Sequence, residues 1–459
     1  MEKILKQKLI DIVGENNFTD RLIDLISYSK DASEHRHRPM GAVWPQNSQQ
    51  VSDILKLANQ ERLPIVPRGA GTGLSGMAVP ERGGVVLDMA RMRRILEIKI
   101  EDRLAVVQPG VVYAQLQKAL DPYGFHFPPD PASGKVATLG GNVATNAGGL
   151  RGAKYGTTRD YVLGLEVVLA DGSILKTGSR TMKCVSGYDL TRLFVGSEGT
   201  LGVITEITLK INPKPKASAT CSAAFQEIRQ AGEAISEIMR SGIIPSVLEI
   251  LDEQCLLALN RHGGQTLPAA AAMVLAEADG YTQEETEYQI AKIVEIFKKN
   301  KATQVAQANS PEEAEKLWTA RKGIGGILYR LSYNMIAEDV TVPISRVPEL
   351  LVGTQEISKR NKVLIATLGH LGDGNLHPGI IFDGRNEEEK LRAEKAAEEL
   401  FQLAIGLGGT LTGEHGIGLA KAPFMPLEHS PVAMRVMRGV KQLFDPNNIL
   451  NPGKMGLEV

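Results

Sequence analysis

The 459-residue sequence contains only three cysteines, and no two of them form a Cys-x-x-Cys pair. Such a sparse set excludes an iron–sulfur cluster held by this chain alone and favours a reducing compartment. The sequence also lacks a long apolar run, because its start has no signal-peptide core and no later stretch approaches the length of a membrane span. We therefore expect a cytoplasmic protein without a transmembrane segment.

The sequence has no excess of charge of either sign. Lys and Arg total 52 against 53 Asp and Glu, a formal net charge of -1, and the basic residues are spread along the chain. This balance gives no electrostatic reason to expect nucleic acid or an anionic membrane surface as a partner. With 43% hydrophobic residues the chain can bury a large core, and its length predicts two or three domains.

Histidine is scarce as well, yet three of the eight fall in two glycine-framed turns. His370 and His377 flank a Gly-Asp-Gly-Asn turn between two strand-like runs, and Glu414 and His415 lie in a later Thr-Gly-Glu-His-Gly turn. The alternative is that these are turn histidines beside a solvated glutamate. Two imidazoles and one carboxylate are a common ligand set that leaves a position open for substrate. We therefore predict a metal site of His370, His377 and Glu414.

A glycine-rich loop follows a short predicted strand near residue 65. Residues 68–76 read Arg-Gly-Ala-Gly-Thr-Gly-Leu-Ser-Gly, and their glycines leave backbone N–H groups free to bind an anion. The loop lacks the Gly-Lys-Ser/Thr ending of a P-loop, and it does not open a helix as a dinucleotide fingerprint does. Taken alone, it fits a plain connection as well as a phosphate site.

Four later motifs occur in a fixed order after this loop. They lie at 138–149 (Thr-Leu-Gly-Gly-Asn-Val-Ala-Thr-Asn-Ala-Gly-Gly), 196–202 (Gly-Ser-Glu-Gly-Thr-Leu-Gly), 369–377 and 413–416. Together the five motifs resemble those of the vanillyl-alcohol oxidase superfamily. The closest resemblance is to its FAD-linked D-2-hydroxyacid dehydrogenases, the branch with D-lactate dehydrogenases, D-2-hydroxyglutarate dehydrogenases and the large flavoprotein subunit of glycolate oxidase. It runs from about residue 43 to the C-terminus.

This resemblance implies an α+β protein with a two-part FAD-binding domain of the vanillyl-alcohol oxidase (PCMH) type and an α+β cap domain. The order of strands and helices after two prolines near residue 214 independently predicts an antiparallel sheet covered by helices on one face. The expected elements include helices at 283–299 and 347–361 and a strand at 336–342. We expect an N-terminal helical segment at 1–35, the FAD-binding domain at 36–215, the cap domain with the metal site at 216–430, and a segment at 431–459 that returns to the flavin.

By the same resemblance the cofactor is FAD. Residues 68–76 would wrap its pyrophosphate, 141–149 would lie along the flavin and 199–204 would approach the adenine side, since small residues admit a long, flat cofactor. Relatives that attach FAD covalently carry a His where this chain has Thr72, so the FAD should be non-covalent. The expected contacts are Arg68, Gly69, Ala70, Gly71, Thr72, Gly73, Leu74, Ser75, Gly76, Pro129, Asp130, Thr138, Gly141, Asn142, Thr145, Asn146, Gly148, Gly149, Tyr155, Gly156, Glu198, Gly199, Gly202, Ile204 and Asn451.

The implied reaction is oxidation of a small D-2-hydroxy acid, D-lactate ahead of glycolate, to the 2-oxo acid. One divalent metal (Zn, Mn or Fe) would coordinate the substrate hydroxyl, His415 matches the family's base, and hydride would pass to flavin N5. Arg321 aligns with the family's carboxylate-binding arginine, and Asn375 would bind substrate or orient a ligand. Residues 323–328 offer no second cation or hydroxyl, although Lys322 is adjacent, so a monocarboxylate is favoured. The D-handedness comes from the resemblance alone.

Electrons must then leave the flavin, and no cysteine cluster provides a route in this sequence. We expect a separate acceptor: an electron-transferring flavoprotein, an iron–sulfur subunit or a quinone. Two other functions stay open. A transferase of the alkyldihydroxyacetonephosphate synthase type shares the fold, but such relatives usually carry a run of adjacent histidines that is absent here. A non-catalytic flavoprotein subunit of a larger oxidase would not need the histidine and glutamate set. The oligomeric state, a homodimer included, and peripheral membrane association also stay open.

Overall fold

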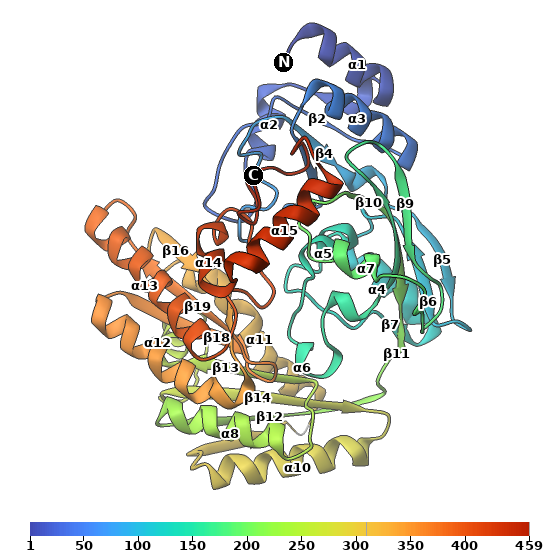
Figure 1. Ribbon diagram of the computed structural model, residues 1–459. Coiled ribbons are helices and arrows are strands. Elements are labelled where there is room, and N and C mark those ends of the chain that lie inside the picture. Colours follow the sequence, from blue (N-terminus) through green and yellow to red (C-terminus); the bar gives the residue numbers. More distant parts are fainter. Residues whose placement is uncertain (309, 459) are drawn as a thin grey trace. The chain divides into compact units, whose positions relative to one another are not determined.

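The computed structural model describes residues 1–308 and 310–458, without the side chains of residues 311 and 320. Internal contacts divide the chain into two units, whose elements are coloured along the sequence in Figure 1. Unit 1 comprises Met1–Gly149, Gly156–Lys214 and Glu414–Val459, and unit 2 comprises Leu150–Tyr155 and Pro215–Gly413. The expected boundary at 215/216 is one residue from an observed one, whereas the expected boundary at 430/431 differs from the observed crossing at 413/414.

The first part of unit 1 is a four-stranded sheet of order β1-β2-β4-β3, in which β4 runs parallel to both β2 and β3. Helix α3 (Ser48–Glu61) connects β2 to β3, begins after the Asn47 cap and buries an apolar face that includes Ile54 and Leu55. The other elements here are α1 (Lys3–Val13), η1 (Glu15–Asn17), α2 (Leu22–Tyr28), β1 (Phe18–Thr19), β2 (Gly41–Val43), β3 (Ile65–Arg68) and β4 (Val85–Asp88). The N-terminal segment is therefore not continuously helical, since Gly14 at φ 85° ends α1.

The second part of unit 1 is a five-stranded antiparallel sheet of order β5-β6-β10-β8-β9. The C-terminal helix α15 (Pro431–Phe444) packs on its core, where the rings of Phe194 and Phe444 are 5.4 Å apart. The remaining elements include β5 (Ile95–Lys99), β6 (Leu104–Val107), α4 (Tyr113–Leu120), β7 (Phe125–His126), α5 (Leu139–Thr145), β8 (Val162–Val168), β9 (Ile174–Gly178), α7 (Leu190–Phe194), β10 (Val203–Lys210), β11 (Asn212–Pro213) and α14 (Met425–Glu428).

Unit 2 is built on an eight-stranded antiparallel sheet of order β15-β12-β14-β13-β18-β19-β16, with β17 also paired to β19. Its strands are β12 (Ala217–Phe225), β13 (Val247–Asp252), β14 (Ala272–Gly280), β15 (Gln304–Gln307), β16 (Asn334–Ala337), β17 (Val340–Thr341), β18 (Leu364–His370) and β19 (Asn375–Phe382). A single strand was expected at 336–342; two short strands, β16 and β17, lie there, and both pair with β19 in one continuous register. That register places Asp339 opposite His377, in the site described below.

Helices cover both faces of this sheet, which corrects the expectation of one covered face. Ile365 and Ile380 pack with α12 and α13, whereas Leu251 and Met273 face the opposite way and pack with α9 and α11. Every residue of β14 is buried, as expected for a strand between two helical layers. The helices are α6 (Gly152–Tyr155), α8 (Ile228–Arg240), α9 (Glu253–His262), α10 (Gln283–Lys299), α11 (Pro311–Leu328), α12 (Val347–Asn361) and α13 (Glu387–Gly406).

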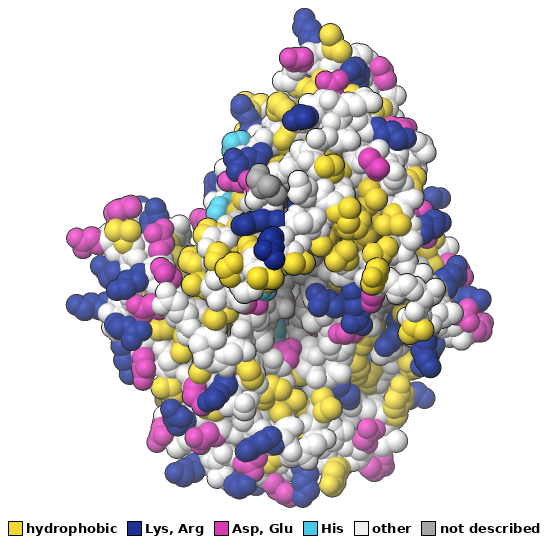
Figure 2. Space-filling model, viewed as in Figure 1, with side chains coloured by type: hydrophobic (Ala, Val, Ile, Leu, Met, Phe, Trp, Pro, Cys, Tyr) yellow, Lys and Arg dark blue, Asp and Glu magenta, His cyan; other side chains and the backbone are white. Residues whose placement is uncertain are grey.

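The surface carries charges of both signs. Figure 2 shows Lys and Arg side chains interspersed with Asp and Glu side chains over the visible face, in keeping with the nearly neutral composition. Of the helices in the described part of the chain, none combines the length and the apolar sequence needed to cross a membrane.

Candidate functional site

Unit 1 contains a cavity of about 490 Å³, a size typical of small-molecule sites. Its wall is formed by the loop after β3, by α5 with the segments beside it, and by the start of β10. The residues expected to bind FAD that line this cavity are Arg68, Gly69, Ala70, Gly71, Thr72, Gly73, Leu74, Thr138, Gly141, Asn142, Thr145, Gly148, Glu198, Gly199, Gly202 and Ile204. Sequence reasoning missed other lining residues, among them Asp31 and Ala132.

Close backbone approach shapes the wall of the cavity. A Cβ atom on Gly69 would lie 2.3 Å from the Thr138 hydroxyl, so these two lining segments meet only because residue 69 has no side chain. Asn142 is buried, and its side-chain nitrogen has no hydrogen-bond partner among the described residues. A buried donor of this kind in a cavity wall fits a ligand that carries acceptor atoms.

Several residues expected to contact FAD do not line the cavity: Ser75, Gly76, Pro129, Asp130, Asn146, Gly149, Tyr155, Gly156 and Asn451. One of them, Asn451, holds the structure around it. The Asn451 side-chain nitrogen donates to the carbonyl of Met77 at 2.9 Å and to that of Glu198 at 2.6 Å. The Tyr155 hydroxyl instead donates to Asp279 within unit 2.

Glu414 and His415 line the same cavity in unit 1. The Ser75 hydroxyl donates to the carbonyl oxygens of His415 and Gly416, at 3.2 and 3.0 Å. The Glu198 carboxylate accepts from the backbone N–H groups of Ile417 and Gly418, at 2.7 and 2.8 Å. Burial raises the pKa of Glu198 from 4.5 to about 7, against the opposing effect of those two hydrogen bonds. The wall of the cavity therefore fixes the backbone that carries His415.

In unit 2, the hairpin of β18 and β19 brings His370 and His377 together, as the sequence predicts. His370 is paired with Asn375 and His377 with Leu368, so both imidazoles project from the same face of the sheet. Their ring centroids are 4.9 Å apart. The Thr341 hydroxyl donates to the side-chain oxygen of Asn375 at 3.1 Å, which fixes this residue beside the histidines.

A fully buried carboxylate lies against the Nδ1 atom of His370. The register of β13 with β18 places Glu249 directly opposite His370, and Glu249 Oε1 is 2.5 Å from Nδ1. The other oxygen, Oε2, accepts a hydrogen bond of 2.6 Å from Nε of Arg321, which reaches in from α11. The terminal nitrogens of Arg321 have no hydrogen-bond partner among the described residues. Sequence reasoning found His370 and Arg321 but missed Glu249, which joins them.

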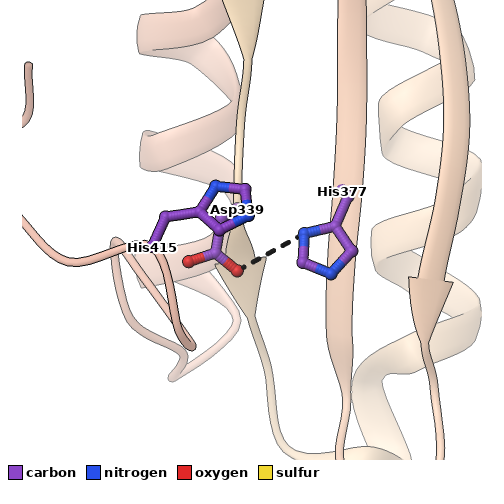
Figure 3. Close-up of side chains that lie close together, drawn as sticks. All are labelled: Asp339, His377 and His415. Atoms are coloured by element: carbon purple, nitrogen blue, oxygen red, sulfur yellow. Dashed lines mark ion pairs between the residues drawn. The ribbon is translucent and has the colours of Figure 1, made fainter. Parts of the chain in front are cut away.

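A second fully buried carboxylate faces His377. Asp339 Oδ1 is 3.6 Å from His377 Nδ1, the contact drawn as a dashed line in Figure 3. Its other oxygen, Oδ2, accepts from the Thr412 hydroxyl at 2.5 Å and from the backbone N–H of Gly413 at 2.9 Å. His415, also drawn in Figure 3, belongs to unit 1. Asp339 therefore fixes the end of unit 2 that directly precedes Glu414.

Each histidine of the hairpin thus has a carboxylate facing Nδ1, which leaves Nε2 on the other side of the ring. This arrangement is usual for metal-binding histidines, because the carboxylate fixes the tautomer and the ring orientation. Gly413 ends unit 2 and Glu414 begins the last segment of unit 1. The N–H of Gly413 is bound to Asp339, and Glu414 and His415 are the next two residues. Because consecutive Cα atoms are about 3.8 Å apart, this bond also restricts where Glu414 and His415 can lie.

Comparison with known proteins gives two family matches and close relatives over nearly the whole chain. Residues 39–178 match the family described as FAD binding domain, and residues 214–455 match that described as FAD linked oxidases, C-terminal domain. The chain is 45% identical over 455 residues to the glycolate oxidase subunit GlcD of Bacillus subtilis (strain 168), covering 99% of this chain and 97% of that one.

A second relative is the mitochondrial D-lactate dehydrogenase (cytochrome) of Arabidopsis thaliana, 37% identical over 421 residues, covering 91% of this chain and 73% of that one. Among solved structures, alkyldihydroxyacetonephosphate synthase is similar with a TM-score of 0.76 and 19% identity, covering 98% of this chain and 86% of that one. At that identity the likeness concerns the fold alone.

Proposed function

Because the chain belongs to the family of FAD-linked oxidoreductases that includes glycolate oxidase subunits and D-lactate dehydrogenases, we propose that it oxidises a small D-2-hydroxy acid to the 2-oxo acid. The predicted family and the predicted α+β fold of the vanillyl-alcohol oxidase type are confirmed. D-lactate is the proposed substrate and glycolate the second. The observation that carries the proposal is the pair of buried carboxylates, one of which orients His370 and holds Arg321.

We assign the cavity of unit 1 to FAD. Its volume, its glycine-rich wall and the unpartnered Asn142 nitrogen fit a long cofactor with many acceptor atoms. Bound there, FAD supplies the acceptor for the hydride that leaves the substrate Cα. His415 lines this cavity, and its imidazole is the proposed base for a substrate held beside the flavin.

His370, His377 and Glu414 are the proposed ligands of one divalent metal, Zn, Mn or Fe. The donor set fits, because Glu249 accepts from an Nδ1–H of His370 and thereby keeps the Nε2 lone pair for a ligand bond. Asp339 Oδ1 faces His377 Nδ1 at 3.6 Å, beyond hydrogen-bond distance, and its other oxygen binds the N–H of Gly413, the residue before Glu414. A metal held there would favour deprotonation of the substrate hydroxyl, and His415 is the proposed base for that proton.

Arg321 is the proposed partner of the substrate carboxylate. Its Nε is bound to Glu249, which leaves the two terminal nitrogens for a second planar group. Asn375, fixed by Thr341, is the proposed hydrogen-bonding group beside the histidines. Lys322 is not proposed as a second cation, since its side chain is 57% exposed and lies 3.4 Å from Glu315. These contacts favour a monocarboxylate over a dicarboxylate.

The electrons are proposed to pass to a separate acceptor protein or to a quinone. Cys221 and Cys255 are buried and Cys184 is exposed, and no pair among them forms a disulfide. One relative's name refers to a cytochrome, which is in keeping with a separate acceptor. The relatives also decide the class of reaction: at 45% and 37% identity they are oxidoreductases, whereas the transferase shares only the fold.

The proposal is tested by anaerobic reduction of the bound flavin with four substrates: D-lactate, L-lactate, glycolate and D-2-hydroxyglutarate. We expect the flavin absorbance to bleach fastest with D-lactate, more slowly with glycolate, and not with L-lactate. Faster bleaching with the dicarboxylate would contradict the substrate assignment. A flavin that none of the four reduces would favour a non-catalytic subunit.

A further inference from the structure

Glu249 is a charged residue of strand β13 whose two sequence neighbours are apolar, and its side chain is completely buried. Charged groups are almost never fully buried unless they are paired. Both of its oxygens are in use, one with the imidazole of His370 and the other with the guanidinium of Arg321. Its two partners come from different elements, β18 and α11.

The two bonds have different consequences. An ionised carboxylate only accepts hydrogen bonds, so in the neutral ring of His370 this contact favours the tautomer with the proton on Nδ1 and the lone pair on Nε2. The bond to Arg321 uses Nε, the nitrogen at the base of the guanidinium, and so fixes the plane in which the two terminal nitrogens lie. One carboxylate therefore orients both the Nε2 lone pair of His370 and the terminal nitrogens of Arg321.

We propose that Glu249 is a positioning residue that couples the metal ligand His370 to the substrate-binding Arg321. This inference rests on the proposed function, in which His370 binds the metal and Arg321 the substrate carboxylate. A change at Glu249 should then disturb two properties at once, metal affinity and substrate affinity. A change at Arg321 should disturb only the second.

The test compares Glu249→Gln with the native FAD-loaded protein. A glutamine side chain accepts hydrogen bonds at one oxygen only, so it cannot receive both His370 and Arg321. We expect about 10- to 100-fold weaker binding of Zn²⁺ or Mn²⁺, measured without substrate by competition with a chelator. We also expect a raised KM for D-lactate. Arg321→Met should raise KM and leave the metal affinity unchanged.

The matched control is Glu277→Gln. Glu277 lies on β14, opposite Val247, and projects from the same face of the sheet as Glu249. It is also nearly buried and also pairs with an arginine, Arg151, at 3.1 Å, but it has no contact with His370. Glu277→Gln should therefore lower the melting temperature without changing the metal affinity or KM.

A largely buried arginine without its partner destabilises a protein, so Glu249→Gln/Arg321→Gln replaces Glu249→Gln if the single variant does not retain FAD. In either variant, a native metal affinity would overturn the inference, and so would a loss of stability alone of the kind expected for Glu277→Gln. Native protein that binds no divalent metal would instead refute the metal part of the proposed function. Glu249→Asp, which keeps the charge, should recover part of the metal affinity.

Discussion

Replacing Asp339 by Asn is the sharpest single test of how the two histidines and the following glutamate are held. The fully buried carboxylate accepts two hydrogen bonds at Oδ2, from Thr412 and Gly413, and faces His377 with Oδ1. An asparagine can keep its oxygen toward the two donors only by turning its NH₂ group toward His377 Nδ1. His377 Nδ1 then faces a neutral amide in place of the carboxylate that lies 3.6 Å away in the native protein.

The expected magnitude follows from these contacts. Loss of the carboxylate facing a metal-binding histidine lowers metal affinity by about 10- to 100-fold, or about 1.4–2.7 kcal/mol. If the amide turns the other way, Thr412 and Gly413 lose a charged acceptor, and each such hydrogen bond contributes about 1.5–3 kcal/mol. Either orientation therefore weakens the site. We expect Asp339→Asn to retain FAD, to bind metal at least tenfold more weakly, and to reduce its flavin more slowly with D-lactate.

The control for Asp339→Asn is Asp252→Asn. Asp252 is also a buried carboxylate of unit 2, and it accepts from the backbone N–H groups of Cys255 and Thr367 at 2.9 and 2.7 Å. Both variants should be less stable to urea, but only Asp339→Asn should lose metal in the chelator competition. Equal metal affinity in the two variants would refute the reasoning, since Asp339 would then support the fold alone.

Three further predictions concern the cofactor, the substrate and pH. Acid precipitation should release yellow FAD into the supernatant, because Thr72 stands where covalent relatives carry a His; flavin in the pellet would contradict this. Arg321→Met should lower kcat/KM for D-lactate by roughly 10²-fold, since a hydrogen bond to a charged group contributes about 1.5–3 kcal/mol; unchanged kcat/KM would remove Arg321 from the site. The pKa of Glu198, raised by burial from 4.5 to about 7, means that the folded apo-protein binds this proton more tightly than the unfolded chain. This stabilisation is present below pH 4.5 and is lost as pH rises through 7. Over that range the free energy of unfolding of the native protein should fall by about 3 kcal/mol relative to that of Glu198→Gln, as measured by urea unfolding at several pH values.

The long helices could be predicted from the sequence because local signals mark them. The expected helices at 283–299 and 347–361 are α10 and α12, with a threonine cap before the first and a left-handed residue, Lys362, after the second. Interruptions were harder to predict. Gly14 ends the first helix early, and Glu338 with Asp339 divides a predicted strand, since a short break leaves little trace in a hydrophobic pattern.

The candidate site was predictable where its residues are close in sequence. His370 and His377 share a hairpin, and its turn signal predicts that they meet. Glu249 and Asp339 are distant in sequence from the histidines, and only the register of β13 with β18 and that of β16 and β17 with β19 place them there. A weak signal was present in both cases: Glu249 has apolar residues on both sides, and Asp339 with Glu338 interrupts an apolar strand sequence, which is unfavourable unless such charges are paired.

The central claim is that a metal at His370, His377 and Glu414 activates a D-2-hydroxy acid for hydride transfer to FAD. It is tested most directly by anaerobic, single-turnover flavin reduction with D-lactate, measured on native protein, on chelator-stripped protein and after one equivalent of Zn²⁺, Mn²⁺ or Fe²⁺ is restored. A parallel variant, His415→Ala, should keep its metal and slow the reduction by roughly 10²- to 10⁴-fold. We predict that stripping abolishes bleaching while the FAD spectrum is retained, and that one of the metals restores it. Flavin reduction at the native rate in stripped protein would contradict the claim.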